Sequence, residues 1–339
     1  MNKSVILVMA CLMVLSCRQA PQRNPQTESS VQVVSSQNVL SRSVYHWKTS
    51  FDLSPEDTMF IREHGIQKIY LRMFDVGMDT DNGRETGEIV PLGTTRFFSR
   101  IPQGCSYVPT VYITLKALKA YDHRETELAD LILQRIYAMC SWNELGDFSE
   151  IQYDCDWTAE TKASFERLCN HTRKELRKNR IILSGTIRLH QIEESTYPFD
   201  KGVLMIYNTG SFMNPDTENS ILDYDDVYKY LSVESRISKF LQARKENCPV
   251  IEVAYPTYEW GVVFDQNRKF SHLVSNPEEH RLQEGETIRL EMSRYSEIMK
   301  VKGLVDSTIG KACSGHILYH LDSENLSRYE SDEIESIYN

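Results

Sequence analysis

Eight short β-rich runs recur along residues 43–322, and most intervals between them are long enough for a crossover helix. Alternating strands and helical patterns favour a parallel sheet, because neighbouring parallel strands must be joined by a crossover. Eight repeats predict a closed α/β barrel of the (β/α)8 type. The runs are residues 43–50, 68–76, 107–114, 150–157, 181–190, 203–210, 250–258 and 315–322.

Helical patterns occupy several of the intervals. Ser54 and Pro55 predict a helix start, because Ser caps helix N-termini and Pro fits the first helical position. Within residues 158–179, apolar and small side chains repeat at helical spacing. Further helical patterns cover residues 124–145, 223–246, 290–302 and 324–337.

A doubly wound open sheet is the alternative architecture. It would call for a Gly-rich turn after the first strand, and no such turn follows residues 43–50. We therefore expect one TIM barrel domain over residues 41–339.

Two connections are irregular. Residues 77–106 lack an amphipathic helix, and residues 261–289 form a long polar insertion after the seventh strand. Each follows a strand, so we expect both long loops on the C-terminal face, where barrels bind substrates. The alternative is that they only decorate the surface.

The N-terminus predicts export. Residues 5–16 form an apolar run that is too short to span a membrane but suits a signal peptide. Ser16 and Cys17, after an aliphatic pair, resemble a bacterial lipoprotein cleavage box, which implies lipid on Cys17. An ordinary secretory peptide with an incidental cysteine is the alternative.

The domain plan follows from this segment. Residues 1–16 are the expected lipoprotein signal, and residues 17–40 a lipidated tether, rich in Gln, Ser and Pro, that we expect to be disordered. The barrel would then be anchored to the outer membrane in the cell envelope, on its periplasmic or its surface side.

The composition limits which classes of partner the chain is expected to bind. The 48 Asp and Glu residues exceed the 38 Lys and Arg, so the net charge is −10. A nucleic-acid partner is not expected, because binding a polyanion requires an excess of cations. No CxxC, HExxH or clustered His pattern occurs, so we expect no metal and no cofactor. The six cysteines after Cys17 are expected to be mostly buried free thiols, with disulfide pairing in an exported protein as the alternative, and the chain is expected to be a monomer.

The fourth strand carries the clearest candidate site. Glu150, Gln152, Asp154 and Asp156 alternate on one face of residues 150–157, which predicts a polar barrel interior. Two carboxylates so close repel each other, so one tends to keep a proton. Such a pair suits acid catalysis or substrate positioning, and the alternative is a hydrogen-bonded network that fills the barrel.

Other strands bring aromatic, amide and charged side chains towards the same end. Flat rings stack on sugar faces, and polar groups bind hydroxyls, so together they predict a glycan site. Arg72 either neutralises the Asp pair or clamps substrate, and Glu252 is a candidate catalytic acid. The substrate-binding candidates are Trp47, Arg72, Arg188, His190, Tyr207, Asn208, Tyr258, Trp260 and Tyr319.

Four segments carry a resemblance to a known family. The segment 153–157 (YDCDW) resembles the D-x-D element on the fourth strand of family 18 glycoside hydrolases, the chitinase-like barrels. Segments 205–208, 254–258 and 315–319 are similar to that family's sixth, seventh and eighth strands, in the right order. The whole chain also resembles exported lipoproteins of Bacteroides-type bacteria. The resemblance implies a TIM barrel that acts on a glycan.

The sequence departs from the family at its acid. The family's catalytic glutamate falls at Thr158, and the first Asp of its longer pattern falls at Ile151. In that family the glutamate protonates the glycosidic oxygen, and the Asp matched by Asp156 orients the substrate's N-acetyl group. Without the glutamate that mechanism cannot run.

Three functional hypotheses stay open. The first is a glycoside hydrolase that uses Asp154 and Asp156 with a relocated acid, for which Glu252 is one candidate. The second is a catalytically inactive surface lipoprotein that binds glycans. The third is a barrel with unrelated chemistry or a structural role.

Overall fold

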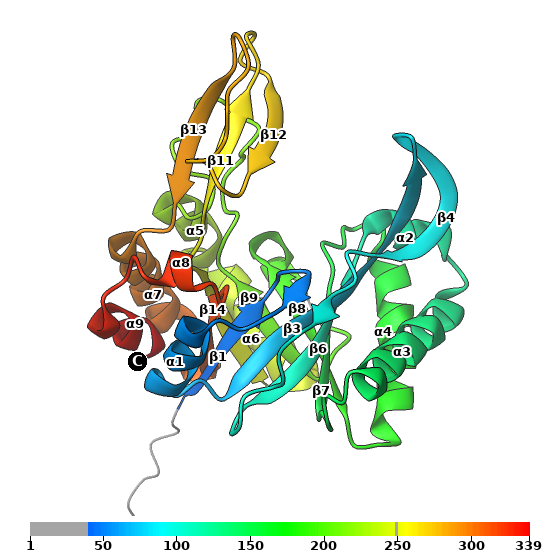
Figure 1. Cartoon of the computed structure of the whole chain (residues 1–339). Coiled ribbons are helices and arrows are strands. Elements are labelled where there is room, and N and C mark those ends of the chain that lie inside the picture. The colour runs from blue at the N-terminus through cyan, green and yellow to red at the C-terminus, as the bar shows by residue number, and fades with distance from the viewer. Residues whose placement is uncertain (1–39, 195, 248–249) are drawn as a thin grey trace, which may run out of the picture. The chain divides into compact units, whose positions relative to one another are not determined.

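The computed structural model describes residues 40–194, 196–247 and 250–339. Within those ranges eight parallel strands form a closed barrel, because β1 pairs with both the second and the last strand (Figure 1). The predicted (β/α)8 barrel is thereby confirmed. In barrel order the strands are β1 (Ser41–His46), β3 (Lys68–Asp81), β6 (Ser106–Ile113), β7 (Glu150–Asp154), β8 (Ile182–Arg188), β9 (Lys201–Met205), β10 (Val250–Pro256) and β14 (Cys313–Tyr319).

Helices follow most of the barrel strands and form an outer layer (Figure 1). The first begins as expected: Ser54 caps it, Pro55 opens it, and Asp57 bonds back to the Ser54 backbone. The helices are α1 (Pro55–Glu63), α2 (Leu115–Ala120), α3 (Glu125–Trp142), α4 (Lys162–Arg177), α5 (Tyr224–Leu231), α6 (Glu234–Asn247), α7 (Tyr295–Ile309), α8 (Ser323–Leu326) and α9 (Ser331–Tyr338), with 3-10 turns η1 (Leu189–Glu193) and η2 (Gly310–Ala312).

A β-hairpin replaces the helix after the second barrel strand. β3 continues beyond the barrel to Asp81 and pairs antiparallel with β4 (Arg84–Leu92), and the short β5 (Arg96–Phe97) then pairs with β2 (Ser50–Phe51). Between β3 and β6 the structure describes every residue, and none lies in a helix. The predicted irregularity of residues 77–106 is therefore a strand extension.

The insertion after the seventh barrel strand is a small antiparallel sheet. β11 (Glu259–Phe264) pairs with both β12 (Phe270–Val274) and β13 (Thr287–Met292). The helix predicted over residues 290–302 is therefore wrong at its start, and α7 begins at Tyr295. The cause is tertiary, since residues 287–292 gain backbone partners from β11 that the local pattern does not reveal.

Alternation along the strands sorts side chains between the barrel interior and the helices. In β7, Tyr153 points outward and its hydroxyl lies 3.0 Å from Thr172 of α4, while Gln152 accepts a 2.7 Å hydrogen bond from Tyr45 across the interior. The predicted inward face of this strand is thus present.

Several sequence-based expectations concern residues outside the described ranges. The signal peptide, Cys17 and nearly all of the tether fall there, as does Cys248. Among the described helices, none is long and apolar enough to cross a membrane. The cysteines that the structure describes are free thiols, namely Cys105, Cys140, Cys155, Cys169 and Cys313.

Candidate active site at the barrel mouth

Buried ion pairs fill the N-terminal end of the barrel. Lys201 Nζ lies 3.2 Å from Glu150 Oε2 and 2.9 Å from Glu252 Oε1. Lys68 Nζ lies 3.4 Å from Glu252 Oε1, and the Tyr70 hydroxyl donates to Glu252 Oε2 at 2.6 Å. Each carboxylate therefore has cationic and neutral donors, which is the condition for burying charge.

Glu252 belongs to this buried cluster, which forms the floor of the barrel interior, and not to the mouth. Burial opposes its ionisation, but Lys201 and Lys68 outweigh burial and hold the pKa of Glu252 at about 2. A general acid must carry a proton near neutral pH. The hypothesis that Glu252 is the displaced acid does not fit these surroundings.

The other end of the interior holds the two aspartates of the fourth strand. Asp154 Oδ1 accepts a 2.7 Å hydrogen bond from Thr186 and a 3.2 Å bond from Arg188 Nη2. Arg188 Nε donates to Asp156 Oδ1, and the Tyr112 hydroxyl donates to Asp156 Oδ2 at 3.3 Å. Arg188, at the end of β8, thus bridges both carboxylates.

This bridge sets the electrostatics of the pair. Burial raises the pKa of Asp154, the Arg188 guanidinium opposes the rise, and Asp156 adds to it. Burial disfavours the Arg188 cation, but the two carboxylates outweigh burial and raise the pKa of Arg188 well above its ordinary value. The Asp156 side chain stays 42% exposed, so its carboxylate can meet a ligand.

Arg72 does not neutralise the aspartate pair. Its Nε and Nη2 donate to Asp75 at 3.0 and 2.6 Å, and its guanidinium carbon lies 5.6 Å from the ring centre of Trp47. Gly93 makes this geometry possible: its φ is +52°, and a Cβ there would lie 2.6 Å from Arg72 Nη2. Arg72 thereby supports Trp47 at the mouth.

Aromatic rings form a continuous group across the mouth. Tyr319 stacks on Tyr207 with ring centres 4.7 Å apart, and meets Tyr258 at 5.6 Å and Trp47 at 5.9 Å. Tyr258 in turn contacts Trp260 edge-on at 5.5 Å. Trp47 and Trp260 are both partly exposed, one at each end of the group.

A cavity of about 710 Å³ opens over four of these rings, Trp47, Tyr258, Trp260 and Tyr319, whereas Asp156 and Arg188 are not among its lining residues. Asn208 reaches it with a φ of +54° and accepts a 2.6 Å hydrogen bond from the Tyr258 hydroxyl. Residues 275–279, between β12 and β13, form part of its wall, so the insertion helps to build the mouth. Two ion pairs edge the cavity, Lys48 with Asp322 and Arg328 with Glu259.

His190 lies apart from this group. The strand predicted over residues 181–190 ends at Arg188, whose backbone N–H donates to the Gln191 side-chain oxygen in the middle of η1. His190 therefore lies on η1 with an exposed side chain, and does not share the inward face of Arg188.

No carboxyl group replaces the family glutamate locally. Thr158 is exposed before α4, with its backbone N–H bonded to Thr161 Oγ1 at 3.0 Å. Glu160 is also exposed and pairs with Lys119 at 2.7 Å.

Sequence reasoning missed three contributors to the site. Tyr112 bonds Asp156, Asp75 holds Arg72, and Met205 Sδ lies 2.8 Å from Arg188 Nη1. Tyr112 could have been found, because it shares the inward-facing alternation of Val108 and Thr110. Asp75 lies beyond a register shift between Arg72 and Phe74, which interrupts that alternation.

The fold has solved counterparts, although no family profile and no curated protein matches the chain. The Bacillus cereus spore cortex-lytic enzyme SleL is 13% identical with a TM-score of 0.50, covering 84% of this chain and 72% of its own. A Nicotiana tobaccum class V chitinase is 11% identical with a TM-score of 0.52, covering 85% and 98%. The fold is chitinase-like.

A third counterpart agrees with these two. The Ostrinia furnacalis group IV chitinase is 9% identical with a TM-score of 0.53, covering 88% of this chain and 99% of its own. Ligand complexes are known for two of these proteins, the Nicotiana tobaccum chitinase with NAG4 and the Ostrinia furnacalis chitinase with allosamidin. The expected chitinase-like TIM barrel is confirmed as a fold.

Proposed function

We propose that the mouth of this chitinase-like barrel binds a neutral oligosaccharide. The observation that carries the proposal is the row of rings from Trp47 through Tyr319 to Trp260, beneath a cavity of about 710 Å³. Partly exposed rings offer flat apolar faces to sugar C–H groups, while a few fixed polar groups orient the ligand.

Asp156 is the proposed polar anchor. Arg188 and Tyr112 hold its carboxylate, and its exposure leaves acceptor capacity for a hydroxyl or an amide N–H. The match of Asp156 to the family's N-acetyl-orienting Asp, and the NAG4 complex of the Nicotiana tobaccum chitinase, support an N-acetylated sugar at this position.

The carboxylates at the mouth favour glycan binding without the family 18 reaction. Thr158 cannot deliver a proton near neutral pH, and Asp322 and Glu259 at the rim are ion-paired. The other carboxylates that line the cavity, Glu278, Glu279 and Glu324, are exposed, so they lack the burial that would keep a proton on a carboxyl group near neutral pH. Hydrolysis with a relocated acid is the second candidate. One observation favours it: Glu259 lines the same cavity, only partly buried, and loses its partner if Arg328 moves.

Calorimetric titration of residues 24–339 with a glycan panel tests binding. The panel holds chito-oligosaccharides, other neutral glycans and anionic glycans. Trp47→Ala and Trp260→Ala should each weaken the best ligand by at least about tenfold, since stacked rings are lost. Trp142→Ala, a matched change at an 88% exposed ring outside the cavity, should have no effect. Absence of binding across the panel would contradict the proposal.

Reducing-sugar release from the same panel separates binding from hydrolysis. Release that falls by orders of magnitude in Asp156→Asn would establish an enzyme, and Glu259→Gln would then test the relocated acid. Binding with no release by the wild type would establish a glycan-binding barrel. Equal release by the wild type and Asp156→Asn would exclude a catalytic role for Asp156.

We further propose that Cys17 carries the lipid that attaches the barrel to the envelope. The support is the apolar run at residues 5–16 and the Ser16-Cys17 junction. Metabolic labelling with an alkyne fatty acid should mark the wild-type chain and not Cys17→Ser. Equal labelling of both would overturn the proposal, and surface proteolysis of labelled cells would report which side of the membrane the barrel faces.

A further inference from the structure

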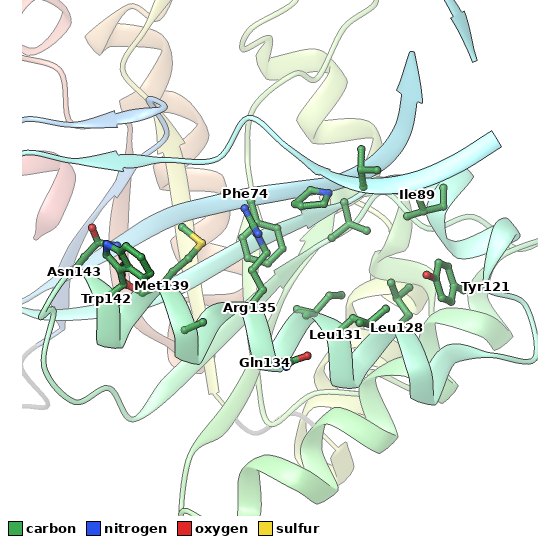
Figure 2. A pocket seen from close by; sticks show the side chains of 15 residues that line it. Phe74, Ile89, Tyr121, Leu128, Leu131, Gln134, Arg135, Met139, Trp142 and Asn143 are labelled. Carbon is green, nitrogen blue, oxygen red and sulfur yellow. Dashed lines mark hydrogen bonds between the residues drawn. The ribbon is translucent and has the colours of Figure 1, made fainter. Parts of the chain in front are cut away.

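A second cavity lies on the outer wall of the barrel, between α3 and the β3–β4 hairpin. It is a groove of about 570 Å³ that shares no lining residue with the mouth. Figure 2 shows α3 along one side and the strands carrying Phe74 and Ile89 along the other. Its walls are mostly apolar, so the groove has the character of a docking surface.

The groove exists because a helix is missing. In a (β/α)8 barrel a helix normally follows each strand and covers the wall. Here the hairpin takes the place of the helix between β3 and β6, and one side of α3 is left without a neighbour. Five residues at helical spacing on that side line the groove, namely Leu128, Leu131, Arg135, Ala138 and Trp142, of which Leu128 is buried.

Two large apolar side chains of this stripe are unusually exposed. Leu131 is 47% exposed and Trp142 is 88% exposed. From Leu128 to Trp142 the stripe spans 15 residues, or about 21 Å at the rise of an α-helix. That length matches an amphipathic helix of about four turns laid along α3.

Arg135 supplies the charge that identifies the occupant. Its Nη2 donates to Thr94 Oγ1 at 2.9 Å, and its guanidinium carbon lies 5.0 Å from the Phe74 ring centre. Its side chain is partly exposed, and no carboxylate in the described ranges forms an ion pair with it. A guanidinium set in an apolar wall calls for an anionic acceptor.

We propose that this groove docks an amphipathic helix of a partner protein, whose apolar stripe carries one Asp or Glu that pairs with Arg135. The spacing along α3 favours a helix over an acyl chain, which has no matching period. A second copy of α3 is a poor occupant, because Glu127 and Asp130 already pair with Arg124 and His171.

A displayed library of helical peptides tests the inference. Peptides of about 18 residues, with apolar residues at i, i+4, i+7 and i+11 and randomised positions between them, are selected against the full-length barrel. We expect recovered binders to share an Asp or Glu at one register. Arg135→Gln should weaken them at least about tenfold, and replacing the peptide acid by its amide should abolish that difference.

Ala138→Glu gives a second and independent variant. It places a charge on an exposed groove position, so it should block binding at least about tenfold without loss of thermal stability. Met59→Glu, a change at an exposed apolar side chain on α1, is the matched control. Both variants should keep glycan binding, which separates this site from the mouth.

Three outcomes would overturn the proposal. The first is that the library yields no binders, or only peptides that bind the Ala138→Glu variant as well as the wild type. The second is that binding does not depend on the peptide acid, or that sodium oleate competes for the groove. The third is concentration-dependent dimerisation lost in Ala138→Glu, which would assign the groove to a second copy.

Discussion

At the scale of single residues, Arg188 holds together two carboxylates that would otherwise repel each other. It reaches Asp154 and Asp156 from the neighbouring strand. Asp154 and Arg188 are largely buried, while Asp156 stays 42% exposed, so the buried carboxylate and the guanidinium depend most on each other for stability.

Replacing this cation should be costly. Arg188→Met should lower the free energy of unfolding by about 3–5 kcal/mol near neutral pH, since both carboxylates lose their counter-charge. Chemical denaturation measures the change. The loss of stability should be smaller in acid. Burial raises the pKa of Asp154 in the folded state, so Asp154 becomes protonated as the pH falls and then needs no counter-charge. Arg124→Gln, at an exposed ion pair, should leave the stability nearly unchanged.

Glu252 should also lose its stabilising contribution in acid, but for a different reason. Its folded pKa of about 2 is depressed, so its contribution is complete above its unfolded pKa of about 4.3 and is lost as pH falls towards 2. Glu252→Gln should therefore destabilise the chain by about 3–5 kcal/mol near neutral pH, with a difference that narrows below about pH 4.3.

Denaturant titrations of wild type and Glu252→Gln across that range measure the difference. Glu259→Gln is the matched control, because its pair with Arg328 is partly solvated and should be worth less than about 1 kcal/mol. If the stability difference between wild type and Glu252→Gln stays constant down to about pH 2, the low folded-state pKa of Glu252 is contradicted.

At the scale of elements, the turn after β4 positions a site residue. Gly93 takes a left-handed φ and leaves room for the Arg72 guanidinium. The hairpin therefore supports the mouth, although most of it projects away from the barrel (Figure 1).

Gly93→Ala should test this support. We expect a loss of about 1–3 kcal/mol and weaker glycan binding, because the new Cβ displaces Arg72 from beneath Trp47. Gly104→Ala is the matched control, since Gly104 has a φ of +86° with open space around it. Gly104→Ala should lose only the stability that a side chain costs at a positive φ, and should leave glycan binding unchanged. Equal effects on glycan binding in the two variants would show that Arg72 does not support the mouth.

At the scale of the whole described domain, the β11–β13 sheet is an insertion that the barrel does not need for closure. Its strands pair with one another, while the barrel closes through β14, β1 and β3. Residues 275–279 nevertheless line the mouth, so we expect the insertion to contribute to glycan binding more than to folding.

Replacing residues 267–285 by a short Gly-Ser turn separates these roles. The barrel should keep its circular dichroism spectrum, and its unfolding temperature should shift by only a few degrees. Glycan affinity should fall at least about tenfold, because one wall of the cavity is gone. Unfolding of the variant would show instead that the insertion is part of the core.

Sequence reasoning located the eight barrel strands, the helix start at Ser54 and the inward face of Glu150, Gln152 and Asp154. These features depend on spacing between neighbours in the chain, and local spacing is visible in a sequence. The aromatic candidates Trp47, Tyr207, Tyr258, Trp260 and Tyr319 were also named from their places on the predicted strands, and the structure brings them together.

Only the tertiary structure decided which charge pairs with which. Arg188 rather than Arg72 bridges the aspartates, and Glu252 lies in the floor because two lysines from other strands meet it there. The strand at residues 287–292 and the groove beside α3 likewise depend on elements distant in sequence. Ion pairing and burial are set by distances across the barrel, and no local pattern encodes them.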